Sequence, residues 1–298
     1  EENPKSSRVP VTVFIRDMND NFPEFTKPIY EVWLPENSRV GTVVVKVQAH
    51  DPDSGDLGTK GIRYTNLGGS VADLLSLDPI SGVITIKEES PAFDRELVSR
   101  HYLTIEARDN RGQGNRNSVQ LILNIEDVND NTPQFVHSKY EARLLENQSD
   151  FDSPLIVEAR DLDLNGTMNS QVHYSIVEWD ASITNFTVDP TLGLVRPSSH
   201  IDFETLARIQ GGPPDVGVRT LRLILRAHDL GSPSLYAEVP LLVYIQDIND
   251  NQPYFEHEVY EQTIPEDLRG GSTVLQVKAT DEDASAPNNQ VVYRIQSG

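Results

Sequence analysis

Alternating apolar and polar residues recur along most of the chain, and this pattern predicts β-strands rather than helices. Apolar residues occupy every second position in segments 43–49, 103–107, 119–125, 221–227 and 239–245. Successive side chains of a strand point to opposite faces, so each of these segments has one apolar face to bury. Turn residues such as those at 78–82 separate the segments. The pattern predicts an all-β chain made of antiparallel sandwiches.

Two end segments show the same alternation without enough neighbouring strands for a core. Apolar residues at 9–15 predict one strand that runs into Asp17. After Pro253 the chain supplies three further strands, the last of them near 291–295. We therefore expect the chain to begin inside one sandwich and to end inside another.

One polar septet occurs three times and divides the chain. It reads Asp-x-Asn-Asp-Asn-x-Pro and begins at Asp17, Asp127 and Asp247. A motif that recurs at the spacing of a domain is typical of the junctions in a tandem array. The septets predict a partial repeat at 1–21, complete repeats at 22–131 and 132–251, and a further partial repeat at 252–298.

The septets also carry a distinct ligand chemistry, since each has oxygen donors but neither cysteine nor histidine. Hard oxygen ligands suit a hard cation such as calcium. The first five residues resemble the start of an EF-hand loop. An EF-hand, however, needs glycine at the sixth position, where the three copies have Phe22, Thr132 and Gln252. Only Glu258, in the third copy, matches the glutamate of the twelfth position.

Four more acidic motifs keep a fixed order relative to each septet. They are a glutamate, an Asp-x-Asp triplet, an Asp-x-Glu triplet and an Ala-x-Asp triplet. In that order they lie at Glu36, 51–53, 94–96 and 107–109, and again at Glu146, 161–163, 202–204 and 227–229. The last partial repeat has Glu266 and 281–283. Isolated aspartates are usually solvated turn residues, but turns alone do not explain motifs repeated in one order.

This arrangement resembles a run of cadherin repeats, whose linker and acidic motifs are similar to those above. The resemblance covers nearly the whole chain. It implies tandem seven-stranded Greek-key β-sandwiches, immunoglobulin-like in architecture and joined by calcium-binding linkers. It also implies the ectodomain of a single-pass membrane protein, of the long non-classical cadherin or protocadherin kind, outside the plasma membrane. Its partners would be other cadherin ectodomains, homophilic or heterophilic.

The resemblance further implies which residues bind Ca²⁺, with up to three ions at each junction. At the first junction they are Asn19, Asp20, Asn21, Asp51, Asp53 and Asp109. At the central junction they are Glu36, Asp94, Glu96, Asn129, Asp130, Asp161, Asp163 and Asp229, with the carbonyls of Val128, Asn131 and Asn169. At the third junction they are Glu146, Asp202, Glu204, Asn249, Asp250, Asp281 and Asp283, with the carbonyls of Ile248, Asn251 and Asn288. We expect the central junction to hold the most ions and the first junction the fewest, because the ligands available differ.

Three features depart from the cadherin pattern. Thr59 or Lys60 stands where the family has a loop asparagine, although the family ligand there is a backbone carbonyl. Phe203 replaces the arginine of the second Asp-Arg-Glu motif, and both carboxylates remain. Residues 207–219 form an insertion, in which Gly-Gly-Pro-Pro at 211–214 predicts a surface loop.

Composition narrows the compartment and the classes of partner. The formal net charge of −21 argues against nucleic acid and anionic membranes. The absence of cysteine excludes disulfides and zinc–thiolate sites, and no apolar segment is long enough to span a membrane. Sequons at Asn147, Asn165 and Asn185 are candidate glycosylation sites and favour a secreted protein. A glycan at Asn147 would crowd the predicted ligand Glu146.

Two functions fit the sequence. One is a calcium-dependent adhesion or tether ectodomain, and the other is a mechanical spacer without a binding partner of its own. An exposed aromatic patch on one strand face would favour adhesion. We expect no enzyme, because the seven histidines are scattered and the acids recur at junctions instead of meeting in one pocket.

Overall fold

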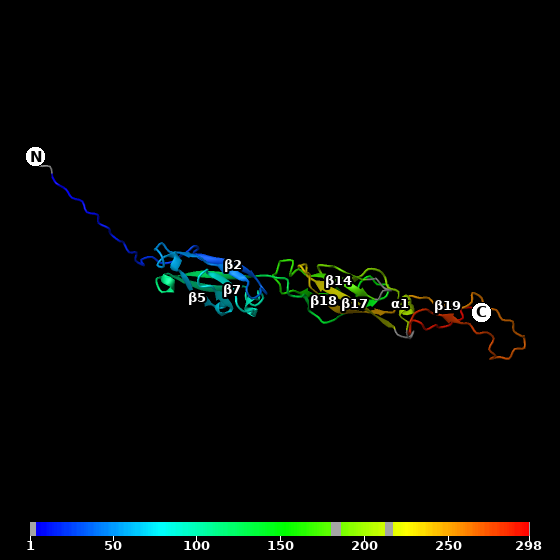
Figure 1. Ribbon diagram of the computed structural model, residues 1–298. Coiled ribbons are helices and arrows are strands. Elements are labelled where there is room, and N and C mark those ends of the chain that lie inside the picture. The colour runs from blue at the N-terminus through cyan, green and yellow to red at the C-terminus, as the bar shows by residue number, and fades with distance from the viewer. Residues whose placement is uncertain (1–3, 180–185, 212–216, 298) are drawn as a thin grey trace. The chain divides into compact units, whose positions relative to one another are not determined.

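The computed structural model describes residues 4–179, 186–211 and 217–297 of the chain. The chain divides into two compact units, Glu1–Val128 and Asn129–Gly298. Each unit contains one β-sandwich, which confirms the all-β fold predicted from the alternation of apolar residues (Figure 1). The division of the chain into four segments stays a prediction.

The first unit packs a four-stranded sheet against a three-stranded sheet. The larger sheet has the order β2 (Ile29–Pro35), β9 (Arg116–Glu126), β8 (Arg100–Arg108) and β5 (Arg63–Gly69). The smaller has β3 (Val43–Lys46), β7 (Val83–Ile86) and β6 (Leu75–Leu77), while β1 (Glu24–Phe25) pairs with β4 (Ala49–His50). Short 3₁₀ helices lie at Thr59–Gly61, Ala72–Leu74, Pro91–Phe93 and Asn110–Gly112. Strands β2 and β9 are parallel, and the other pairs are antiparallel.

The second unit repeats this order of strands. The larger sheet has β11 (Tyr140–Leu145), β18 (Tyr236–Gln246), β17 (Val218–His228) and β14 (His173–Trp179). The smaller has β12 (Leu155–Ile156), β16 (Leu194–Pro197) and β15 (Phe186–Val188), while β10 (Gln134–Phe135) pairs with β13 (Ala159–Arg160). Strands β19 (Tyr254–Phe255) and β20 (Ala279–Thr280) then form a separate pair, and helix α1 spans Phe203–Gln210.

The predicted apolar faces form the two cores. Leu103, Ile105 and Ala107 on β8 are at most 1% exposed, and the alternate residues from Val119 to Ile125 on β9 are buried opposite them. The equivalent positions of β17 and β18 line the second core. Each large apolar side chain that is fully buried contributes about 1.5–3 kcal/mol. The paired strands therefore fix the loops at their ends, and these loops carry the acidic motifs.

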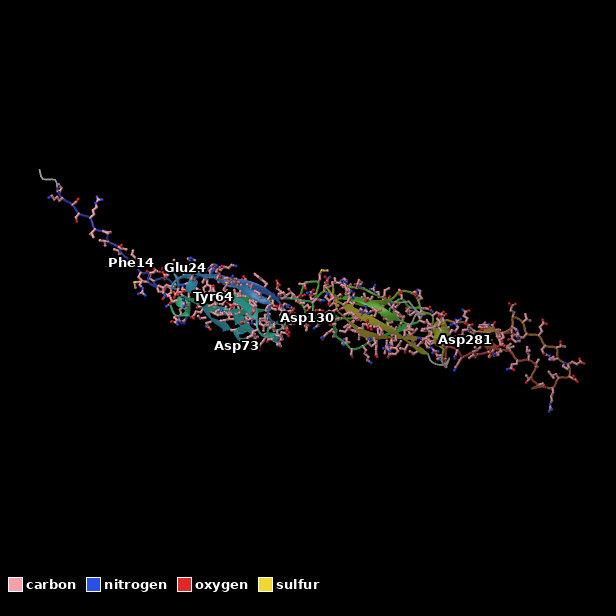
Figure 2. All side chains as sticks on the ribbon, in the orientation of Figure 1. Phe14, Glu24, Tyr64, Asp73, Asp130 and Asp281 are labelled. Carbon is pink, nitrogen blue, oxygen red and sulfur yellow. The ribbon has the colours of Figure 1, made fainter. Side chains whose placement is uncertain are left out.

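The two predicted end strands are wrong. No strand is found among residues 4–23, and Phe14 is 92% exposed in an extended segment (Figure 2). No strand is found among residues 281–297 either, where Val292 and Ile295 are exposed. Alternation provides an apolar face, but a strand also needs a neighbour to accept its backbone hydrogen bonds. These two segments lack such a neighbour among the described residues.

The insertion begins within a helix that was not predicted from the sequence, and most of the predicted loop at 211–214 lies outside the described residues. Asp202 caps α1 by accepting a hydrogen bond from the Thr205 backbone N–H over 2.6 Å. Phe203 and Leu206 face the core, and Gly211, at φ +66°, ends the helix. Residues 212–216 lie outside the described part of the chain. Within the described part, no helix is long and apolar enough to cross a membrane.

Candidate metal centres at the linkers

The first septet meets two loops of the first sandwich. Asn19 donates from Nδ2 to Asp109 Oδ1 over 2.8 Å, and the Asn21 backbone N–H donates to Asp53 Oδ2 over 3.2 Å. Asp51 and Asp109 are buried, and Oδ2 of each has no hydrogen-bond partner among the described residues. Burial, reinforced by the charges of Asp53 and Asp109, raises the pKa of Asp51. The structure thus brings together five of the six predicted ligands, and two buried oxygens are available to a cation.

Asp20 is exposed at the edge of this first group. Its Oδ1 accepts a hydrogen bond from Asn21 Nδ2 over 3.0 Å. Asn115 holds the septet in place, because its Nδ2 donates to the carbonyl of Asn21 over 2.6 Å. Asn115 was not among the predicted residues, because it orients the septet by a hydrogen bond and carries no charge that could bind a cation.

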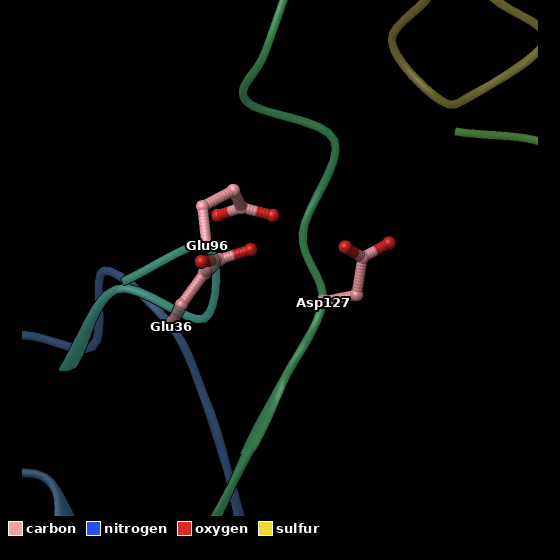
Figure 3. A group of neighbouring side chains, drawn as sticks. All are labelled: Glu36, Glu96 and Asp127. Atoms are coloured by element: carbon pink, nitrogen blue, oxygen red, sulfur yellow. The ribbon is translucent and has the colours of Figure 1, made fainter. Parts of the chain in front are cut away.

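A second acidic group lies at the opposite end of the first sandwich. Glu36 receives two backbone N–H donors, from Arg95 at 2.8 Å and from Val128 at 2.7 Å. Carboxylate oxygens of Glu36, Glu96 and Asp127 lie within 4.8 Å of one another (Figure 3). Arg95 donates to Asp127 Oδ1 over 2.6 Å and also contacts Glu96. The arginine thereby offsets part of the repulsion among three clustered carboxylates.

Burial, reinforced by the neighbouring carboxyl of Glu36, raises the pKa of Glu96 to about 7. Asp94, by contrast, is not part of the close group around Glu96. Its Oδ1 accepts the Leu97 backbone N–H over 3.2 Å. The structure therefore gives Asp94 a local capping contact, while its role as a ligand stays a prediction.

A third acidic group lies at the start of the second unit. Asn131 donates to Asp163 Oδ1 from both its backbone N–H, at 3.2 Å, and its Nδ2, at 2.8 Å. Asn129 donates from Nδ2 to Asp229 Oδ2 over 3.1 Å, whereas Asn129 Oδ1 is buried and has no hydrogen-bond partner in the described part of the chain. Asp161 accepts the Asp163 backbone N–H over 2.9 Å. The amide donors thus orient the carboxylates and leave an oxygen of Asn129 available.

Two further predicted ligands belong to this third group. Asp130 is exposed, and its Oδ1 accepts a hydrogen bond from Asn131 Nδ2 over 2.9 Å. The carbonyl of Met168 accepts the Leu230 backbone N–H over 3.0 Å. This contact places Asn169, a predicted carbonyl ligand, beside the loop that follows Asp229.

Two glycines that sequence reasoning missed make room for these contacts. A Cβ atom on Gly114 would lie 1.8 Å from Asp109 Oδ1, and one on Gly231 would lie 2.5 Å from Asn129 Oδ1. Any larger residue would displace a predicted ligand. A glycine follows each Ala-x-Asp motif closely, in the sequences Arg-Gly-Gln-Gly and Gly-Ser-Pro. These glycines could have indicated that no Cβ atom is tolerated there.

A fourth acidic group, which lies wholly within the second unit, is centred on Glu146. Glu146 is 0% exposed and accepts the backbone N–H of Phe203 at 2.7 Å and of Ile248 at 2.8 Å. Burial raises the pKa of Glu146, and the charges of Asp250 and Asp247 add to the effect. This carboxylate therefore ties the start of α1 to the third septet.

Two overlapping sets of carboxylates extend the group around Glu146. Oxygens of Glu146, Glu204 and Asp250 lie within 4.8 Å of one another, as do oxygens of Glu204, Asp247 and Asp283. Burial, followed by the charge of Glu146, raises the pKa of Glu204 to about 7. Glu204 Oε1 and Asp283 Oδ2 are buried without a hydrogen-bond partner among the residues described. Such a concentration of buried negative charge without a cation nearby is unfavourable.

The other predicted ligands of the third junction surround these sets. Asn251 donates to Asp283 Oδ1 from its backbone N–H and Nδ2, and Asp281 accepts the Asp283 backbone N–H. Asn288 donates from Nδ2 to Asp247 Oδ2 over 3.2 Å. Asp202 lies outside the close sets. Burial raises the pKa of Asp250, and the charges of Asp283 and Asp202 add to the effect. Asn249 is exposed.

Asp127 and Asp247 are the acidic residues that sequence reasoning missed. Both are the first residue of a septet, and both belong to close carboxylate sets. The signal was present in the sequence, because each septet has an aspartate at this position. Asp17 occupies the same position in the first septet and accepts Ser54 N and Oγ at 2.7 and 2.8 Å.

The sequons differ in their surroundings. Asn147 donates from Nδ2 to Asp250 Oδ2, so the atom that would carry a glycan contacts an acidic set. Asn165 is exposed. Asn185 lies outside the described residues.

Comparison with known proteins decides the family. The cadherin domain family matches residues 30–126 and 140–246. The chain belongs to the cadherin family. It is 40% identical over 245 residues to cadherin-86C of Drosophila melanogaster, across 80% of this chain and 12% of that protein. It is 34% identical to cadherin-related family member 2 of Homo sapiens, across 96% of this chain and 20% of that protein. The chain thus spans a fifth or less of the length of these relatives.

Solved cadherin structures share the fold. The mouse cadherin-23 fragment EC22-24 matches with a TM-score of 0.60 and 29% identity, over 78% of this chain and 67% of that fragment. The protocadherin gammaB7 EC3-6 cis-dimer structure matches with a TM-score of 0.66 and 28% identity, over 92% of this chain and 64% of that one. The family and the matched structures are runs of cadherin domains, which agrees with the expectation that the chain is not an enzyme.

The chemistry of the donor set fits the calcium ions that cadherin repeats bind. The close sets contain only oxygen ligands, and several buried oxygens, such as Asp109 Oδ2, Glu204 Oε1 and Asp283 Oδ2, accept no hydrogen bond from the described residues. Calcium takes 6–8 oxygen ligands and tolerates irregular geometry. A divalent cation would convert the repulsion among these carboxylates into attraction.

Proposed function

We propose that the chain is part of an extracellular adhesion or tether ectodomain whose inter-repeat linkers are stiffened by calcium. The observation that supports it most is the set of buried carboxylates around Glu146, which draws ligands from a sandwich, a septet and the following segment. A cation shared by these three elements cannot keep its coordination when the linker bends. Calcium binding would therefore add to the resistance of this linker to bending.

The proposed ligands are the residues expected from the sequence, together with Asp127 and Asp247. Glu146, Glu204, Asp250 and Asp283 would hold the ions at the third junction, because their oxygens already converge. Calcium would supply positive charge to the site and would take no part in catalysis. The chain's own backbone donors, such as the Ile248 N–H, orient the carboxylates before the ion arrives.

A specific surface feature favours adhesion over a purely mechanical spacer. Trp33 on β2 and Tyr102 on β8 are 57% and 55% exposed on the outer face of the larger sheet of the first unit. Strand β9 lies between them, and its Ile122 pairs with Tyr102. Exposed Trp and Tyr residues on one face of a sheet are typical of protein–protein contacts. We propose another cadherin ectodomain as the partner.

The proposed function is tested by bead aggregation. Beads coated with the full ectodomain should aggregate in millimolar calcium and disperse in EDTA. Trp33→Ala combined with Tyr102→Ala should reduce aggregation about tenfold, which corresponds to about 1.4 kcal/mol of binding free energy. The matched control is Tyr236→Ala, which removes an exposed aromatic residue of the second unit. Aggregation that is equal for all variants would favour the spacer function.

The raised pKa values of Glu96 and Glu204, both about 7, predict proton release on calcium binding. The folded pKa of each carboxyl lies above its unfolded value. In calcium-free solution each group therefore stabilises the fold at low pH, and this contribution is lost as the pH rises from about 4.5 through about 7.

Calorimetric titration with calcium at pH 6, in buffers of different ionisation enthalpy, should detect release of about one to two protons, since both carboxyls must ionise to bind. At pH 8.5 the release should vanish. Proton release that is equal at both pH values would contradict the assignment of these two carboxyls.

A further inference from the structure

Helix α1 distinguishes the end of the second sandwich from that of the first. In the first unit, β8 begins at Arg100, soon after the Asp94-Arg95-Glu96 motif. In the second unit, α1 and the rest of the insertion separate Asp202 from the start of β17 at Val218. Phe203 and Leu206 of α1 lie in the core of the sandwich. The helix is therefore a firmly held platform beside the third septet.

The segment that follows the third septet packs on this platform. Ala207 of α1 and Ala284, which follows the Asp281-Glu282-Asp283 motif, both pack against the core of the second sandwich. Figure 1 shows α1 at the end of that sandwich from which the chain continues to β19. A single groove is lined by Glu204, Ala207 and Arg208 of α1 and by residues 280–284 and 289. The partly buried side chain of Ala284 in the following segment thus packs against the preceding core.

A second contact comes from the end of the insertion. A Cβ atom on Gly217 would lie 2.9 Å from Ser285 Oγ, so the backbone at Gly217 touches Ser285. The carbonyl of Gly217 also accepts the Asp247 backbone N–H over 3.2 Å. The insertion therefore reaches both the septet and the loop after it.

The replacement of arginine by Phe203 gives Asp247 a different set of contacts from Asp127. In the first unit the equivalent arginine, Arg95, donates to Asp127. Asp247 instead accepts hydrogen bonds from Ser285 Oγ at 2.5 Å and from Asn288 Nδ2 at 3.2 Å. The linker aspartate of the third junction thus contacts the following segment directly.

We propose that α1, Gly217 and Asp247 form a clamp on residues 284–288 that holds the third linker in place without calcium. The clamp deepens the proposed function and rests on it, since it concerns which linkers depend on calcium. Apolar packing at Ala207 and Ala284 needs no cation, and it opposes the repulsion of the carboxylates when calcium is removed. The third linker stays ordered in EDTA, whereas a linker without such packing becomes mobile.

Distances between spin labels test the clamp, and the lack of native cysteine allows labels at chosen positions. One pair of cysteines replaces the exposed residues Arg222 and Glu258, on the two sides of the third linker. A reference pair replaces Thr104 and Arg222, on the two sides of the central linker. In EDTA the first distance distribution should stay narrow, and the reference distribution should widen about twofold.

Ala284→Glu should widen the 222–258 distribution in EDTA about twofold, because a charged side chain cannot enter the apolar contact. Ala207→Glu tests the other side of the contact, and Thr205→Glu on the exposed side of α1 is the matched control. A wide 222–258 distribution in the parent chain in EDTA, or a narrow one in Ala284→Glu, overturns the clamp. The proposed function is judged separately, since it fails when calcium leaves the 104–222 distribution unchanged.

Discussion

Removing calcium with EDTA should lower the melting temperature of the chain by roughly 10 °C. Extracellular calcium modules bind with dissociation constants of about 10⁻⁴–10⁻³ M. At ten times the dissociation constant each independent site stabilises the fold by about 1.4 kcal/mol. Two filled sites therefore supply about 3 kcal/mol, which shifts the melting temperature of a domain of this size by roughly 10 °C. Thermal melts followed by circular dichroism would measure the shift.

The control for chelation is magnesium at the same concentration. Magnesium requires near-ideal octahedral geometry and loses water reluctantly, so it should restore little of the lost stability. Adding calcium back should restore all of it. Identical melting curves in calcium and EDTA would contradict calcium binding by the acidic groups, whatever the family relationship.

Strand alternation predicted most of the fold because burial of one face fixes the direction of every second side chain. It predicted the apolar faces at 103–107 and 119–125, which lie in the core. It failed at 9–15 and 291–295, where apolar alternation is present and no pairing strand is found among the described residues. The helix at Phe203–Gln210, capped by Asp202, was not predicted, because the Gly-Pro sequence that follows it indicated only a loop. The local sequence pattern gives a preference for a strand, but the strand forms only where a neighbouring strand can pair with it.

The acidic groups were predictable from the sequence, because a carboxylate is recognisable as an oxygen ligand from its residue type alone. Carboxylates of Glu36 and Glu96 lie close together, as do those of Glu146 and Glu204, while their role as calcium ligands stays a prediction. The supporting residues were not predictable, because Gly231 and Asn115 act through a missing Cβ atom and an amide donor. Such roles depend on distances between segments far apart in the sequence, as between Asn115 and Asn21.

Glu146→Ala should destabilise the chain by about 2–6 kcal/mol even in EDTA. The carboxylate is 0% exposed and accepts two backbone N–H groups, from Phe203 and Ile248. Removing it leaves two donors without a partner, and each buried donor without a partner costs about 1–3 kcal/mol. Urea unfolding in EDTA would measure the loss. Glu141→Ala is the matched control, since Glu141 is exposed and its ion pair with Lys139 contributes little.

Glu204→Gln should stabilise the chain in EDTA, whereas Glu146→Ala should destabilise it. Glu204 Oε1 is buried without a hydrogen-bond partner in the described part of the chain, and the ionised form is disfavoured by burial and by Glu146. At pH 8 in EDTA, replacing the charge should therefore stabilise the chain, by about 1 kcal/mol. In calcium the same variant should be less stable than the parent, because a charged ligand is lost. At pH 5 in EDTA the difference should disappear, since Glu204 is then protonated. If the variant were more stable than the parent in both EDTA and calcium at pH 8, or less stable in both, Glu204 would not be held near a cation.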